Sequence, residues 1–192
     1  MSKRIALLSA AAIGALALTA TLVAPVSAQD KMKSEMSGER TVMVGGAAMF
    51  PSKNIIQNAV KSKDHTTLVA AVKAAGLVDT LEGKGPFTVF APTDAAFGKL
   101  PAGTVDTLVK PENKATLTKI LTYHVVPGKL EASDLTDGKK LKTVQGEELT
   151  VKRSGNTVMI IDAKGGSSTV TIPNVNQSNG VIHVVDTVLM PS

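Results

Sequence analysis

The sequence predicts a single α+β domain, because its apolar residues repeat with a helical period in the first half and alternate in the second. The chain has 192 residues, which suits one domain and leaves little room for another. Its hydrophobic content of 43% is sufficient for a core, since a domain of roughly 150 residues buries about 70% of its unfolded surface. We therefore expect a helix-rich N-terminal half and a strand-rich C-terminal half.

The first 28 residues have the pattern of a signal peptide. Lys3 and Arg4 precede an apolar run, which ends near Pro25 and the small residues Val26-Ser27-Ala28. We expect cleavage after Ala28 and a periplasmic or secreted protein without a stable membrane anchor. An uncleaved anchor is the alternative, since about 20 apolar residues can span a bilayer.

Residues 29–50 have no sustained helical or strand period, so we expect a flexible arm that contains four methionines. Thioethers suit Cu(I), but the methionines are irregularly spaced and no His or Cys accompanies them, so no metal site is expected. Val42, Val44 and Phe50 are expected to lie against the domain, which covers residues 51–192.

Two helices are expected between residues 52 and 76. A proline and a capping hydroxyl precede the first helix, and Asp64 and Thr66 offer caps for the second. Gly76 suits the left-handed residue that ends such a helix. The apolar residues of the two helices repeat at helical spacing and include Ile55, Ile56, Val60, Leu68 and Val72.

A short buried strand is expected over residues 87–91, after Gly85-Pro86 breaks the chain. Three more helices follow. Thr93-Asp94 can cap the first, a short one covers residues 105–109, and Asn113 can cap the last. The inward positions of that last helix are Leu117, Ile120, Leu121 and His124.

Beyond Pro127-Gly128 the apolar residues alternate, which predicts strands. The candidates are residues 141–144, 148–152, 157–161, 168–172 and 181–189. Short turns rich in Gly and Asn separate them, so neighbouring strands are expected to be antiparallel. The last candidate is apolar almost throughout and is expected to run through the interior.

Composition argues against catalysis. The chain contains no Cys, which excludes disulfides, thiol catalysis and cysteine zinc sites. The three histidines are His65, His124 and His183, and no nucleophile-elbow sequence surrounds a serine. We expect His65 to be solvated beside Asp64 and the other two to be hydrogen-bonded in the core. We therefore expect no enzyme, no cofactor and no bound metal.

The charge distribution argues against nucleic-acid binding, because the lysines are scattered among acidic residues and form no continuous basic stripe. Loss of the leader with Lys3 and Arg4 would lower the formal charge from +5 to about +3. Such a small excess is compatible with weak affinity for an anionic polysaccharide or the cell envelope.

Three segments resemble the signature regions of the fasciclin domain. They are GPFTVFAPTDAAF at residues 85–97, YHVVPG at residues 123–128 and NGVIHVVDTVL at residues 179–189. Their order and spacing match, and the similarity covers roughly residues 51–191. The resemblance implies a wedge or sandwich of about seven mostly antiparallel strands flanked by several helices. It also implies the exported single-domain form found in bacteria, with a role in cell adhesion and extracellular-matrix contacts.

The resemblance also places two recognition elements of the family on this chain. Tyr123-His124 matches a Tyr-His motif implicated in integrin-type attachment, although a buried pair would instead order the loop over residues 125–130. The family's Asp-Ile pair corresponds to Asn174-Val175, so an amide replaces the carboxylate. A metal-dependent receptor contact needs a carboxylate oxygen, so this substitution argues against animal-receptor binding. The candidate interaction residues are Tyr123, His124, Asn174 and Val175.

Two functions remain open. One is a non-enzymatic module that binds a surface protein or a polysaccharide through exposed loops. The alternative is a carrier of an apolar small ligand, since some fasciclin-like proteins are water-soluble carotenoid binders. The arm would then close an apolar groove, although core packing explains the groove residues equally well. The groove residues would be Ile55, Ile56, Val60, Leu68 and Val72.

Overall fold

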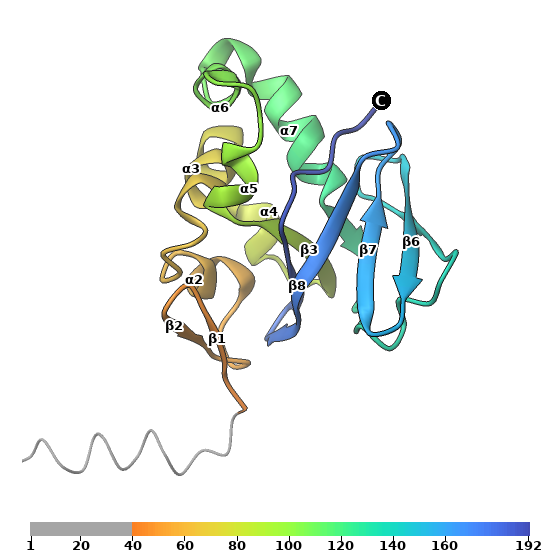
Figure 1. Ribbon diagram of the computed structural model, residues 1–192. Coiled ribbons are helices and arrows are strands. Elements are labelled where there is room, and N and C mark those ends of the chain that lie inside the picture. The colour runs from red at the N-terminus through yellow and green to blue at the C-terminus, as the bar shows by residue number, and fades with distance from the viewer. Residues whose placement is uncertain (1–39) are drawn as a thin grey trace, which may run out of the picture. The chain divides into compact units, whose positions relative to one another are not determined.

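The computed structural model describes residues 40–192 (Figure 1). The expected signal peptide and residues 29–39 of the expected arm lie outside this range. The described chain opens with an antiparallel hairpin, β1 (Val42–Val44) and β2 (Ala47–Met49). Its two-residue turn, Gly45-Gly46, has φ values of 56° and 75°, which glycine adopts without steric cost.

This hairpin lies within the stretch expected to be an arm, so regular structure is present before Pro51. The strands have three residues each, which is too short for a strand period to be visible in the sequence. Val44 and Met49 are both 3% exposed, so their burial against the body holds the hairpin. The three residues expected to contact the domain are buried or half-buried: Val42, Val44 and Phe50.

The helices confirm the expected helix-rich first half. Each of the five expected helices is present, and Gly76 ends the second with a left-handed φ of 72°. The structure adds one short α-helix and a 3-10 turn, which are too short to show a helical period. The elements are α2 (Ile55–Ala59), α3 (Thr66–Ala75), α4 (Val78–Glu82), α5 (Asp94–Gly98), α6 (Thr104–Leu108), η1 (Pro111–Asn113) and α7 (Lys114–Tyr123).

Seven strands form one mixed sheet in the order β4-β3-β9-β8-β7-β6-β5. Neighbours are antiparallel except for β3 and β9, which run parallel. Every strand candidate of the second half overlaps a strand, and β4 is an additional three-residue strand. The strands are β3 (Phe87–Pro92), β4 (Val125–Pro127), β5 (Lys140–Lys142), β6 (Glu148–Ser154), β7 (Thr157–Ile161), β8 (Ser167–Gln177) and β9 (Gly180–Val185).

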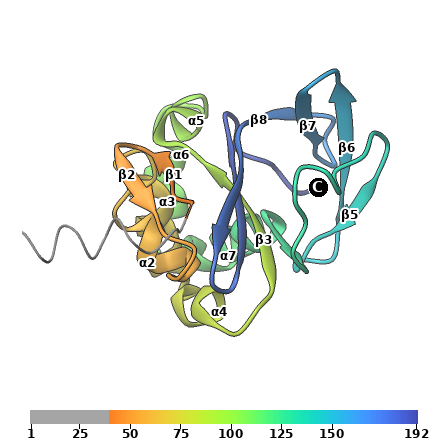
Figure 2. The same cartoon turned by 90° about the horizontal axis from the view of Figure 1, so that it is seen from below.

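The sheet curls until its two edges approach each other, and the Val144 N–H donates to the Val125 carbonyl at 2.8 Å. Strands β5 to β7 lie on one side of β3 and β8, and the helices lie on the other (Figure 2). Side chains alternate along β3, so Phe90 faces the inside of the curl while Val89 and Ala91 face the helices.

The described chain consequently has two buried clusters. The sheet-side core, inside the curl, comprises Phe90, Tyr123, Val126, Leu135, Leu141, Leu149, Val151, Val158, Ile160, Val185 and Leu189. The helix-side core lies between the sheet, the helices and the hairpin, and includes Val44, Met49, Ile55, Ile56, Leu68, Val72, Leu81, Leu121, Val125, Ile182 and Val184.

Asn179 connects the sheet to the helices. Its Oδ1 accepts the Ile55 N–H at 3.1 Å, and its Nδ2 donates to the Leu81 carbonyl at 2.6 Å. The next residue, Gly180, lies so close to β3 that a Cβ there would be 2.0 Å from the Phe87 oxygen. The Asn-Gly pair thus positions α2 and α4 against the sheet, in addition to forming the turn before β9.

Candidate functional site

The first residue of the Tyr-His motif is inside the domain. Tyr123 is fully buried, and its hydroxyl accepts the Ala163 N–H at 2.8 Å and donates to the Glu148 carbonyl at 3.4 Å. Burial raises the pKa of the Tyr123 hydroxyl, so it remains protonated at neutral pH. The side chain therefore joins the end of α7 to β6 and to the loop after β7.

The second residue, His124, uses both of its ring nitrogens internally. A carbonyl can only accept, so Nδ1–H donates to the Ile120 oxygen at 2.9 Å. Nε2 then accepts the Leu189 N–H, also at 2.9 Å. Burial lowers the pKa of His124 to about 4, against opposing effects of the Ile120 carbonyl and Asp162. The ring is therefore neutral at pH 7, as expected for a hydrogen-bonded core histidine.

His183 is the third side chain of this kind. Its Nε2 donates to the Leu130 carbonyl at 2.8 Å, and its Nδ1 accepts the Asn174 N–H at 3.4 Å. The ring stacks on Phe90, with 5.7 Å between centroids. Burial lowers the pKa of His183, so this ring is also neutral at pH 7. The expectation of a core histidine is confirmed here as well.

The Asn174-Val175 pair lies at an irregularity in the pairing of β8 with β9. Asn174 has a φ of 57°, a left-handed conformation that Asn tolerates better than most residues. Its Oδ1 accepts the Ala132 N–H at 2.7 Å, while Val175 is buried. The amide that replaces the family's carboxylate therefore has an internal partner.

Three side chains, those of Thr88, Asn174 and His183, hold one surface loop, which we call the anchored loop and define as residues 128–134. Thr88 Oγ1 donates to the Gly128 carbonyl at 2.7 Å and accepts the Leu130 N–H at 2.8 Å. Asn174 and His183 bind the same loop as described above. Its exposed residues are Lys129, Ser133 and Asp134, and the side chain of Glu131 is also exposed. Of the candidate interaction residues, Asn174 thus bonds to this loop from within, whereas Tyr123 and His124 bond to other parts of the chain.

His65 is not solvated, contrary to expectation. It is 3% exposed, because Asp94 of α5 caps α3 and holds the start of that helix against the body. The Asp94 carboxylate accepts the Thr66 hydroxyl at 2.6 Å and the Thr67 N–H at 2.8 Å. The expected caps, Asp64 and Thr66, are therefore not used as N-caps, because a residue from another helix takes their place.

The His65 ring has one partnered and one unpartnered nitrogen. Nδ1 lies 2.9 Å from Ser62 Oγ. Nε2 and Asn176 Oδ1 are the buried side-chain polar atoms that lack a hydrogen-bond partner within residues 40–192. Burial lowers the pKa of His65, while the nearby Ala91 carbonyl and two carboxylates oppose this shift. Of these opposing groups, the Ala91 carbonyl has the largest effect on the pKa of His65.

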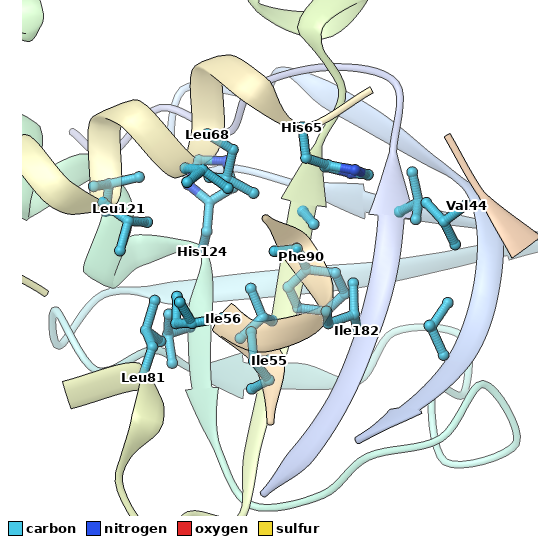
Figure 3. Close-up of a pocket in the computed structure, with 18 of the residues that line it drawn as sticks. Val44, Ile55, Ile56, His65, Leu68, Leu81, Phe90, Leu121, His124 and Ile182 are labelled. Atoms are coloured by element: carbon cyan, nitrogen blue, oxygen red, sulfur yellow. The ribbon is translucent and has the colours of Figure 1, made fainter. Parts of the chain in front are cut away.

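His65 lies in the wall of an apolar cavity of about 40 Å³ in the helix-side core. Side chains converge on this cavity from β1, α2, α3, α4, α7 and the sheet (Figure 3). Val60 of the expected groove lies outside it and is 49% exposed, because it follows α2 on the outer surface. The expected groove residues that do line it are Ile55, Ile56, Leu68 and Val72.

Two of the three histidines are held by backbone hydrogen bonds. His124 and His183 have both ring nitrogens bonded to backbone groups, so neither is free to act as a general base. Over the described range 40–192, no three His, Asp or Glu side chains are grouped to hold a metal ion. In the same range, no helix is long and apolar enough to cross a bilayer.

The fold and the inward-facing motifs define a small domain that presents ordered loops on a curled sheet. The sequence model of the fasciclin domain matches residues 63–191, and the chain belongs to the fasciclin domain family. Members of this family are generally non-enzymatic and of the adhesion type.

Curated relatives agree with this assignment. The chain is 48% identical to protein sll1483 of Synechocystis sp., over 80% of this chain and 82% of the relative. It is 35% identical to the immunogenic protein MPB70 of Mycobacterium bovis, over 97% and 96% of the two chains. The cell surface glycolipoprotein MPB83 of M. bovis is 45% identical over 60% of this chain and 48% of its own length.

A solved structure supports the fold. The chain resembles a FAS1 domain pair from the insect cell adhesion molecule fasciclin I, with a TM-score of 0.65 and 21% identity. The similarity covers 73% of this chain and 52% of that one. At this identity the likeness concerns the fold alone.

Three features of the site were not predicted from the sequence: the hairpin over the cavity, the unpartnered His65 nitrogen and the anchoring role of Thr88. The spacing of Ser62 and His65 was an available signal, since residues three apart can pair at a helix start. No local signal distinguishes Thr88 from its neighbours, because its loop partners follow 40 and 42 residues later.

Proposed function

We propose that this protein is an exported, non-enzymatic module that binds a surface protein or a polysaccharide through its anchored loop. The observation that carries the proposal is that buried groups hold this loop from beneath, so its polar side chains are presented to solvent with a defined backbone. An ordered loop loses less conformational entropy on binding than a mobile one. The leader pattern and the cell-surface relative support export.

An attachment assay on coated surfaces tests this function. Lys129 and Glu131 form an exposed ion pair on the loop, with 3.5 Å between Nζ and Oε1. The double variant Lys129→Ala/Glu131→Ala leaves the net charge unchanged and should weaken attachment about fivefold, as expected for loss of roughly 1 kcal/mol at a contact. The control is Lys140→Ala/Glu148→Ala, which removes a similar exposed pair at 3.3 Å on the sheet. Equal attachment by both variants and the wild type would reject the loop as the contact.

The nature of the partner can be tested in the same assay. Cell envelopes treated with protease or with glycosidase distinguish a protein partner from a polysaccharide. Loss of attachment after only one treatment identifies the class.

A second candidate function is the carriage of an apolar small ligand in the helix-side core. The cavity of about 40 Å³ would have to enlarge, because ligand pockets usually measure about 300–1,000 Å³. Incubation of the purified protein with a carotenoid, followed by gel filtration, tests this function. A carrier would coelute with visible absorbance, whereas colourless protein in every preparation would remove carotenoid from consideration.

A further inference from the structure

The excess positive charge of the described chain lies in one segment. Residues 40–63 contain four basic residues and no acidic residue, whereas residues 64–192 contain thirteen of each. The net positive charge of residues 40–192 therefore belongs entirely to residues 40–63, which we call the basic segment. Its cations are Arg40, Lys53, Lys61 and Lys63.

The fold brings these cations, which are separated in the sequence, onto one part of the surface. The basic segment comprises hairpin β1–β2, α2 and the turns that flank α2. Figures 1 and 2 both show the hairpin beside α2, on the other side of β3 and β8 from β6 and β7. The Lys63 N–H donates to the Gly45 carbonyl at 3.2 Å, and the Asn58 side chain bonds the Phe50 N–H and carbonyl. These contacts hold the hairpin against α2 and the turn that follows it.

The cations of the basic segment have no carboxylate partner among residues 40–192, because every ion pair in that range is formed by a lysine outside the segment. Lys53 Nζ lies 5.0 Å from the centroid of the Phe50 ring. Contact with the Lys61 side chain, together with its positive charge, lowers the pKa of Lys53. Two like charges side by side repel each other, and a nearby anion relieves this repulsion. The surface therefore suits a partner with closely spaced negative charges.

The same segment exposes apolar side chains. Within the described range, the exposed large hydrophobic residues are Met43 (59%), Val60 (49%) and Val144 (45%), and the first two belong to the basic segment. Met43 lies on the face of the hairpin that is turned away from buried Val44. Lysines beside exposed apolar side chains suit a bilayer with anionic headgroups, which offers both phosphates and an apolar layer. A hydrated polysaccharide offers only the charges.

We propose that the basic segment is a second binding surface of this protein and that its partner is a lipid bilayer with anionic headgroups. The lysine and arginine side chains contact the headgroup phosphates, and Met43 and Val60 enter the boundary between headgroups and acyl chains. The attachment is peripheral and reversible, since a few basic residues without a lipid chain bind weakly. The anchored loop is not part of this surface, so the inference goes beyond the proposed function and is tested separately from it.

Vesicle sedimentation tests the inference. The exported protein is mixed with vesicles of phosphatidylcholine alone, or of equal parts phosphatidylcholine and phosphatidylglycerol, and the bound fraction is measured. We expect at least about tenfold tighter binding to the anionic vesicles, and weaker binding as the salt concentration rises. All comparisons use variants of the same exported protein, so that any contribution of residues 1–39 is common to them.

Charge variants locate the contact. Lys53→Gln/Lys61→Gln should weaken binding to the anionic vesicles about twentyfold, since each lysine near an anionic surface contributes roughly fivefold. The matched control is Lys142→Gln/Lys152→Gln, which removes the same charge from exposed positions on β5 and β6. It should change binding by less than about twofold, because charges far from the bilayer are screened.

Apolar variants distinguish a bilayer from a polysaccharide. Val60→Thr keeps the shape of the side chain but adds a hydroxyl, and should weaken binding to anionic vesicles about threefold. Val144→Thr changes a similarly exposed valine outside the basic segment and should have no effect. Alginate, an anionic polysaccharide, is the alternative probe. Tighter binding of alginate than of anionic vesicles, unaffected by Val60→Thr, would assign the surface to a polysaccharide and overturn the inference.

Three other results would also overturn it: equal or absent binding to the two kinds of vesicle, equal weakening by the two lysine pairs, or unchanged vesicle binding by Val60→Thr. The variant Lys129→Ala/Glu131→Ala keeps the two proposals apart. It should bind anionic vesicles as the wild type does, whatever its attachment to coated surfaces. Loss of vesicle binding in this variant would place the lipid contact on the anchored loop and reject the basic segment as the site.

Discussion

The two cores of this domain share β3 and β9 but are enclosed differently. The sheet-side core is surrounded by strands joined through backbone hydrogen bonds, and Phe90, Leu149 and Ile160 within it are completely buried. Its polar neighbours Tyr123 and His183 have partners for every ring nitrogen or hydroxyl. The helix-side core is enclosed by short helices and a hairpin, and contains a cavity and an unpartnered histidine nitrogen.

This difference indicates that the two cores contribute differently to stability and to binding. A continuous hydrogen-bonded sheet fixes the distances between its strands, so side chains inside the curl can fill the available space. Helices and hairpins meet mainly through side chains, which allows small displacements without loss of backbone hydrogen bonds. We therefore expect the sheet-side core to contribute most of the stability and to position the anchored loop. We expect the helix-side core to allow small displacements of its helices and hairpin.

Leu→Ala truncations in the two cores should cause the largest losses in the free energy of unfolding, and the two losses should differ. Leu149→Ala in the sheet-side core should lower the free energy of unfolding by about 4 kcal/mol, because a fully packed site loses both burial and contacts. Leu68→Ala should cost about 2 kcal/mol, because Leu68 already faces a cavity and has fewer contacts to lose. Urea unfolding measures both, and equal losses would contradict the proposed difference in packing.

Acid should destabilise the domain through its buried neutral histidines. The unfolded His124 titrates near pH 6.5, whereas burial lowers its folded-state pKa to about 4. Protons therefore bind the unfolded chain first, and the stability present above pH 6.5 is lost as the pH falls towards 4. This residue alone should account for about 3 kcal/mol. Urea unfolding at a series of pH values checks this, and His124→Leu should flatten the dependence while Val60→Ala should not.

Replacement of His124, whose two ring nitrogens have partners, should lower the free energy of unfolding more than replacement of His65, which has one unpartnered nitrogen. His124→Leu leaves the Leu189 N–H and the Ile120 carbonyl without partners, and should cost about 2 kcal/mol. His65→Leu removes a buried ring nitrogen that has no partner, so its net effect should be within about 1 kcal/mol of zero. Thermal or urea unfolding compares the two. A larger cost for His65→Leu would mean that its Ser62 bond outweighs the unpartnered nitrogen.

A small and local effect should come from loss of the cap that holds α3. Asp94→Ala removes the acceptor of the Thr66 and Thr67 N–H groups and should cost about 1 kcal/mol. Hydrogen exchange should accelerate at the start of α3 and remain unchanged in β6 and β7. Asp106→Ala, an exposed acidic residue in the first turn of α6, is the control. Acceleration throughout the sheet would show that the two cores are not independent.

Much of the fold could be predicted because its signals are local. Strand β7 has the bounds that alternation predicts, and the apolar stripe of α7 is buried as its period indicates. The Gly-Gly turn of the hairpin was visible, but three-residue strands are too short to establish a period. The parallel pairing of β3 with β9 joins Phe87 to Gly180, which no local pattern can indicate.

The candidate site could be predicted only in part, because it depends on contacts between segments that are distant in the sequence. Apolar spacing correctly marked Ile55, Ile56, Leu68 and Val72 as inward positions, but it could not distinguish a filled core from one that encloses a cavity. Val60 has the same spacing and is exposed, because α2 is short and ends before it. The environment of His65 was wrongly predicted, because its burial depends on Asp94, which is 28 positions from Thr66.

The sequence by itself determined the α+β class, most of the helices and strands, and the membership in the fasciclin family, since these depend on period, turn residues and motif order. The tertiary structure alone decided which polar groups have partners. Whether a buried donor is satisfied depends on distances of a few tenths of an ångström between segments that are remote in the chain. For this reason three histidines in one sequence become two with both ring nitrogens bonded and one with an unpartnered ring nitrogen.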